Sequence, residues 1–211
     1  MNNEFVFEKE NNQSLREMAY MSMRRAIIKG DLKAGQRLIE MAMSEQMGMS
    51  RGPIREALRQ LEHEGLVIST AYRETVVAEV SEEEVENILV PIRLIAECYA
   101  AKKACTIFTK ANYDYLNKLV DLMSMAVTKQ DLDSFSEYDL QFHEYILERS
   151  EITSLITIWK SIVGKIYIRI FLQGYQRKNL EEVIKEHSEL IQLIREGNTE
   201  GIDRHLKAHI F

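Results

Sequence analysis

A chain of 211 residues has room for one large or two modest domains, and its 45% hydrophobic content is ordinary for a globular protein. It lacks the roughly 20 uninterrupted apolar residues of a membrane-spanning helix, and its polar start is unlike a signal peptide, so no membrane partner is expected. The net charge of −6 argues mildly against nucleic-acid binding by the chain as a whole.

The charge is unevenly divided along the chain. Residues 13–73 contain ten Lys and Arg against seven Asp and Glu, whereas residues 81–211 contain sixteen against twenty-one. The N-terminal part is therefore the one suited to a polyanion.

Cys98 and Cys105 lie seven residues apart on one predicted helix, roughly 10 Å apart and too far for a disulfide. Reduced thiols are typical of a cytoplasmic protein.

The first elements are expected to be short helices. Residues 1–13 are polar and are expected to form an arm or to be disordered. A helix over 15–29 should end at Gly30, a short one is expected over 42–47, and a third over about 51–64 should stop at Gly65. In the first helix, the residues expected to point inward are Leu15, Met18, Ala19, Met23 and Ile27.

The third helix carries the strongest motif. Gly48 supplies a tight turn before it, Ser50 is a natural N-cap, and Pro53 lies in the first turn, where a missing N–H costs nothing. Its apolar stripe is Ile54, Ala57, Leu58 and Leu61. Arginines at 51, 55 and 59 fall outside that stripe. A helix that buries one side and offers arginines near its N-terminus fits the DNA major groove, although basic amphipathic helices are mostly solvated surfaces of ordinary domains.

Two short strands, 66–69 and 75–80, are predicted next, around a tip of residues 71–74 that contains Arg73 and no glycine. A capping box from Ser81 to Glu84 then opens a second half that is helical throughout. The predicted helices are 82–108, 111–129, 134–149, 152–173, 180–196 and 199–210. Pro91 is expected to kink or break the first of them. No repeat of fixed period is present, so a bundle is favoured over a solenoid. The fold class is therefore mainly α, with domains over 1–80 and 81–211.

Histidines are concentrated in the helical half. Asp139 and His143 are spaced i, i+4 beside the stripe of Phe135, Phe142 and Ile146. His187 lies in the middle of another apolar stripe, and His209 lies on the inward side of the last helix. A single Asp-x-x-x-His is most often a surface pair, and a single inward histidine is usually hydrogen-bonded in the core. Four such groups from three helices would be costly to bury unpaired, and one divalent metal would satisfy them together.

The sequence from Ser50 to Leu58 (SRGPIREAL), followed by Leu61 and Glu64-Gly65-Leu66-Val67, resembles the winged helix-turn-helix of the bacterial GntR transcription regulators. The helical half resembles the FCD-type ligand-binding domain of the FadR subfamily, which has Asp-x-x-x-His on one helix and single histidines on two later ones. The resemblance implies these metal ligands: Asp139, His143, His187 and His209. His205 lies four residues before His209 and is the alternative third histidine, although family spacing favours His209. Arg93 and Glu97 match the family's arginine and glutamate.

The resemblance implies a homodimeric, cytoplasmic regulator that binds a double-stranded DNA operator. Arg51 and Arg55 are the expected contacts to base edges, with Arg59, Arg73 and Ser50 on phosphates. The mixed ligand set suits zinc, nickel, manganese or iron. A small organic acid would bind the metal while Arg93 neutralises its charge, and its binding would weaken the grip on DNA.

Three alternatives accompany this interpretation. In the first, the metal itself is the signal. In the second, the metal is purely structural. In the third, the site belongs to a metal-dependent enzyme resembling non-haem iron oxygenases. Oxygenase sites of that kind normally lie on a β-barrel, and the chain contains no P-loop, nucleophile elbow or dinucleotide motif, so catalysis is disfavoured.

Overall fold

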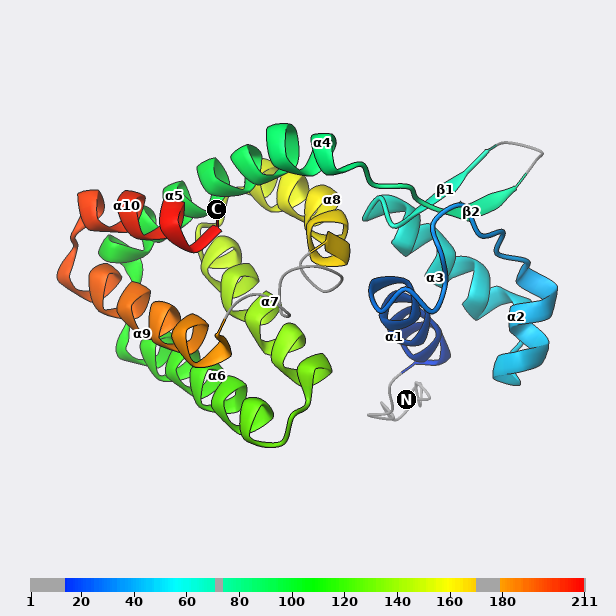
Figure 1. The fold of residues 1–211 in the computed structure, drawn as a ribbon, viewed down its shortest axis with the longest axis horizontal. Helices are drawn as coiled ribbons and strands as arrows, with labels where there is room; N and C mark the ends of the chain where they lie inside the picture. The colour runs from blue at the N-terminus through cyan, green and yellow to red at the C-terminus, as the bar shows by residue number, and fades with distance from the viewer. Residues whose placement is uncertain (1–13, 71–73, 170–178, 211) are drawn as a thin grey trace, which may run out of the picture.

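The computed structural model describes residues 14–70, 74–169 and 179–210. Helices dominate it, and a two-stranded hairpin is the one sheet of the described residues. Figure 1 shows two groups of elements. One group contains the first three helices and the hairpin. The other contains the remaining helices, with α4 and α8 on the side that faces the first group. In the part of the chain that the structure describes, no helix has both the length and the apolar character needed to cross a bilayer.

The first group has its own core. Its elements are α1 (Leu15–Ile28), α2 (Glu40–Met47), α3 (Arg51–His63), β1 (Val67–Ser69) and β2 (Thr75–Val77). The predicted stripe of α3 is buried, from Ile54 to Leu61, and packs on α1. Gly48 and Gly65 adopt left-handed φ angles of 63° and 69°, which glycine reaches without strain, and these turns end α2 and α3 as the sequence predicts.

Two details of this group differ from expectation. Leu15 and Met18, predicted to point inward, are exposed, because the face of α1 that packs on α3 is formed by Ala19, Met23 and Ile27. The second helix begins two residues earlier than predicted, at Glu40. Strands β1 and β2 pair antiparallel, with Ile68 opposite Val76, as expected of a wing.

The helical half contains the larger core. Its elements are α4 (Glu82–Glu84), η1 (Val85–Leu89), α5 (Val90–Ile107), α6 (Lys110–Thr128), α7 (Leu132–Arg149), α8 (Thr153–Arg169), α9 (Leu180–Glu196) and α10 (Thr199–Ile210). Helix α6 packs along α7, and α5 contacts α7, α9 and α10. The proline is accommodated without a break, because the π-helical turn η1 precedes it and Pro91 occupies the first turn of α5, where no N–H is required. Cys98 and Cys105 are free and half-buried.

The two groups are joined by close contacts between α1, α3, α7 and α8. Arg24 of α1 is buried and lies 3.5 Å from Glu64 at the end of α3 and 3.7 Å from Glu137 of α7. Gly164 of α8 lies so near Leu66 that an added Cβ would be 2.8 Å from the leucine side chain. The two groups are thus linked by charge, through Arg24, and by the packing of Leu66 against α8.

Candidate metal centre and DNA interface

The outward face of α3 is basic. The side chains of Arg51, Arg55 and Arg59 are 61%, 50% and 67% exposed, whereas the opposite face of the helix is buried. The sequence-based expectation that α3 buries one side and offers these arginines to solvent therefore agrees with the structure.

The other predicted DNA-contacting residues vary in what the structure shows. Ser50 occupies the N-cap position of α3, but its side chain makes no capping hydrogen bond and stays exposed. Arg59 donates to Glu56 at 2.9 Å. Arg73 lies outside the described residues. Glu40 of α2, which the sequence analysis did not connect to this face, forms ion pairs with Arg51 and Arg55.

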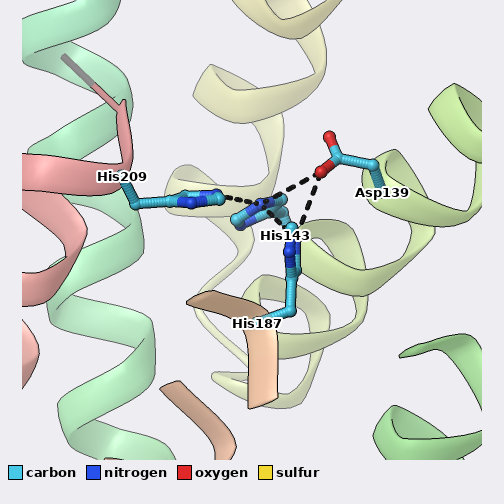
Figure 2. Close-up of side chains that lie close together, drawn as sticks. All are labelled: Asp139, His143, His187 and His209. Carbon is cyan, nitrogen blue, oxygen red and sulfur yellow. Dashed lines mark hydrogen bonds and ion pairs between the residues drawn. The ribbon is translucent and has the colours of Figure 1, made fainter. Parts of the chain in front are cut away.

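The structure brings the four predicted metal ligands together in the helical half. Asp139 and His143 come from α7, His187 from α9 and His209 from α10, and Figure 2 shows their side chains converging. One ligand atom from each lies within 4.8 Å of the others. Asp139, His143 and His187 are buried, and His209 is half-buried at the edge of the group.

Polar contacts at Nδ1 orient the three imidazoles. The Nδ1 atom of His143 is 2.7 Å from Glu97 Oε2, that of His187 is 2.7 Å from the carbonyl of Val183, and that of His209 is 2.6 Å from Glu186 Oε2. Each Nδ1 faces an acceptor, and in the tautomer that suits this arrangement Nδ1 carries the proton and Nε2 keeps its lone pair for a metal.

These Nε2 atoms point at one another. His143 Nε2 lies 3.3 Å from Nε2 of both His187 and His209, and Asp139 Oδ1 is 3.1 Å from His187 Nε2. Four acceptor atoms so close repel one another unless a cation or additional protons lie between them. The donor set therefore fits a divalent metal, for which neutral imidazole and carboxylate are ordinary ligands.

The surroundings of Asp139 and His209 favour the protonation states that metal binding requires. Burial alone would raise the pKa of Asp139, but its close contact with His187 and the nearby positive charge of Arg93 hold that pKa well below its usual range. Burial, together with the adjacent imidazoles, lowers the pKa of His209 well below its usual value. An ionised carboxylate and a neutral imidazole are what coordination requires.

Arg93 lies behind this cluster. Its Nε donates to Glu97 Oε1 at 2.6 Å, and Glu97 Oε2 in turn faces His143. Both Arg93 and Glu97 are buried, and the guanidinium also lies over the ring of Trp159, 5.8 Å from its centroid. Burial opposes the charge of Glu97, yet Arg93 and His143 lower its pKa to about 2. Arg93, predicted to bind an effector, is thus connected to His143, a candidate metal ligand, through one shared carboxylate.

The structure distinguishes the two candidate third histidines. His205 directs Nε2 to the backbone carbonyl of Glu186 at 2.8 Å, away from the cluster, while His209 joins it. A recess of about 190 Å³ at the α9–α10 surface is lined in part by His205, His209 and Glu186. His209 is therefore the candidate ligand that borders solvent.

Several site residues were missed by sequence reasoning. Tyr167 of α8 donates its hydroxyl to Asp139 Oδ2, and Glu186 holds His209. The buried indole N–H of Trp159 has no hydrogen-bond acceptor among the described residues. These partners come from helices distant in sequence, and their spacing carries no local signal.

A helix-turn-helix with a β-hairpin wing, joined to a helical domain, defines a transcriptional regulator. Residues 15–77 match the family of bacterial regulatory proteins known as the gntR family, and residues 89–211 match the FCD domain. The chain belongs to the GntR family, in the FCD-containing group to which the FadR subfamily corresponds. The enzyme alternative is set aside, because this family and the chain's relatives are regulators.

Known proteins resemble nearly the whole chain. The HTH-type transcriptional repressor RspR of Escherichia coli is 23% identical over 94% of this chain and 86% of its own length. The gluconate operon transcriptional repressor of Bacillus licheniformis is 28% identical over 82% of this chain and 72% of its own length. The solved structure of E. coli McbR/YncC has the same fold, with a TM-score of 0.73 and 23% identity over 94% of both chains.

Proposed function

We propose that this DNA-binding regulator senses a small organic acid at a metal centre formed by Asp139, His143, His187 and His209. The observation that carries the proposal is the convergence of three Nε2 lone pairs and one carboxylate oxygen within 4.8 Å. This donor set suits zinc, nickel, manganese or iron, and the bound ion would supply a Lewis-acid contact for a carboxylate. The sensing domain corresponds to residues 81–211, and the DNA-binding domain to residues 1–80.

The buried charges around the metal centre support an anionic effector. Arg93 is a permanent cation beside the cluster, and a guanidinium can pair with a carboxylate through two parallel hydrogen bonds. The unpartnered indole N–H of Trp159, against which Arg93 lies, offers a further donor. A cationic effector would be repelled by the Arg93 guanidinium.

The DNA-binding half supports contacts to base edges by Arg51 and Arg55, with Arg59, Arg73 and Ser50 on phosphates. Arg51 and Arg55 extend from the first two turns of α3, where a helix inserted in the major groove contacts bases. A regulator that binds an operator on the bacterial chromosome must be located in the cytoplasm, and we propose this location for the protein.

A homodimer is the assembly we propose. An apolar stripe runs along η1 and α5, where Ile88, Ile95 and Tyr99 are 53%, 70% and 52% exposed. Their spacings of seven and four residues place them on one side of the helical segment. A second copy that covers this stripe would pair two α3 helices for two half-sites.

Arg24 provides a route from the metal centre to the DNA-binding half. Glu137 lies two residues before Asp139 on α7, and Arg24 joins it to Glu64 at the end of α3. A shift of α7 on ligand binding would alter this pair of contacts and with it the seating of α3. The required coupling is modest, about 1–3 kcal/mol.

The first test measures metal. Purified parent protein, a His187→Ala variant and a His205→Ala control are loaded with zinc, nickel, manganese or iron(II), dialysed and analysed for bound metal. The parent and His205→Ala should retain one ion per chain, because His205 lies outside the cluster, and His187→Ala should lose it. Equal retention by all three proteins would refute the metal centre.

The second test measures DNA affinity. A duplex selected by the parent from a random library is titrated with protein in the presence of individual small carboxylic acids. Gluconate heads the panel, because one relative's name refers to the gluconate operon. An active acid should change affinity by about 5–150-fold. A response to chelation with no response to any acid would instead identify a metal sensor, and the absence of both responses would leave the metal a structural role.

A further inference from the structure

Glu40, the first residue of α2, is bonded to both arginines that we assign to base edges. Its Oε1 accepts from Arg55 Nε at 3.0 Å, and its Oε2 accepts from Arg55 Nη2 at 2.9 Å and from Arg51 Nη2 at 3.1 Å. The contact with Arg55 is therefore bidentate, the arrangement that fixes a guanidinium in orientation as well as in position.

Glu40 binds one hydrogen-bonding edge of the Arg55 guanidinium and thereby determines which edge remains available to DNA. A guanidinium has two bidentate edges, one formed by Nε and Nη2 and the other by Nη1 and Nη2. Glu40 holds the first, and no described residue accepts a hydrogen bond from Nη1. The second edge is the one that can donate in parallel to O6 and N7 of guanine.

Glu40 is less exposed than the two arginines that it binds. Its side chain is 27% exposed, against 61% for Arg51 and 50% for Arg55. The hydrogen bond from Arg55 lowers the pKa of Glu40, so the carboxylate stays ionised at neutral pH. A carboxylate placed this way supports the guanidinium from the protein side and leaves its outer edge open to a base.

We propose that Glu40 is a positioning residue that sets base specificity by fixing the orientation of Arg55. This inference rests on the proposed function, in which Arg55 contacts a base edge. Glu40 itself touches no DNA in this arrangement. Its removal should therefore affect the choice among base pairs more than the attraction to DNA in general.

The experiment compares five proteins: the parent, Glu40→Gln, Arg55→Ala, the double variant of these two, and a matched control, Glu56→Gln. The control removes the same charge and breaks another arginine pair on the DNA-facing side, that of Arg59. Each protein is titrated by fluorescence anisotropy with the duplex selected by the parent and with all single-base-pair variants of that duplex.

Glu40→Gln should lose about tenfold of its discrimination at the base pair where Arg55→Ala loses discrimination, and affinity for unrelated DNA should not fall. The Glu56→Gln control should keep the parental profile. A double variant, Glu40→Gln with Arg55→Ala, should discriminate at that base pair no less than Arg55→Ala alone, because Glu40 acts through Arg55.

An unchanged discrimination profile in Glu40→Gln would overturn the inference, whether overall affinity rises, falls or stays the same. A rise with the profile intact would identify Glu40 as a competing anion that DNA must displace. If Arg55→Ala keeps the parental profile, it is the proposed role of Arg55 that fails. The two failures are therefore distinguishable.

Discussion

Glu97 is the carboxylate that holds Arg93 and His143 together, so replacing it by leucine should be strongly destabilising. The side chains of Arg93 and Glu97 are each only 4% exposed. Removing one partner of such a pair leaves the other charge buried without compensation, which costs about 3–5 kcal/mol of unfolding free energy. His143 Nδ1, 2.7 Å from Glu97, would also lose its acceptor.

The double variant Arg93→Leu with Glu97→Leu separates these two costs. With both charges gone, the remaining penalty is the unpaired N–H of His143, about 1–3 kcal/mol. Guanidinium denaturation followed by circular dichroism, with a chelator present to exclude metal binding, measures both variants. A single variant that loses less than about 1 kcal/mol, or a double variant as unstable as the single one, would refute the reasoning.

The same pair gives a pH dependence. The pKa of Glu97 is lowered from 4.5 to about 2 in the folded protein, because Arg93 and His143 outweigh the effect of burial. A group whose folded pKa is depressed contributes stability above its unfolded pKa, and that stability is lost as the pH falls through the folded value. The free energy of unfolding of the parent should therefore decline between pH 4.5 and about 2. The double variant should show a shallower decline over this interval.

Three further predictions concern the joint and the assembly. Gly164→Ala should lower the unfolding free energy by about 1–3 kcal/mol, because the new Cβ would lie 2.8 Å from Leu66. Its control in denaturation is Gly52→Ala, where nothing lies within 4 Å. Ile95→Glu should halve the molar mass measured by light scattering, and an unchanged mass would exclude the α5 stripe as the dimer contact. Arg24→Gln should keep its metal yet lose most of the change in operator affinity produced by an active acid, and a full response would rule out the proposed route.

Periodicity within single helices accounts for what the sequence predicts correctly. The stripe from Ile54 to Leu61 and the i, i+4 pair of Asp139 and His143 each depend on one helix, where the 3.6-residue repeat fixes the shared side. The same repeat could not separate His205 from His209, because residues four apart lie on the same side. That choice depends on where α10 meets α9, which is a tertiary contact.

The residues that orient the functional groups could not be predicted from the sequence. Glu40 meets Arg55 across a turn, and Tyr167 meets Asp139 from another helix. Such pairs depend on how helices pack, and neither member carries a local pattern that identifies the other. Leu15 illustrates the converse case, since this apolar residue at helical spacing is exposed where no element of the described residues covers it.

The joint formed by Leu66 against Gly164, and by Arg24 between Glu64 and Glu137, has a consequence for building hybrid biosensors. Exchanging halves between relatives by cutting at the linker before Ser81 would separate Leu66 from the gap that receives it. A graft that transfers these matched surfaces together with the linker should retain a tight fit. Whether two domains fit together in such a hybrid thus depends on a few buried side chains at their contact. The length or composition of the connecting peptide matters less.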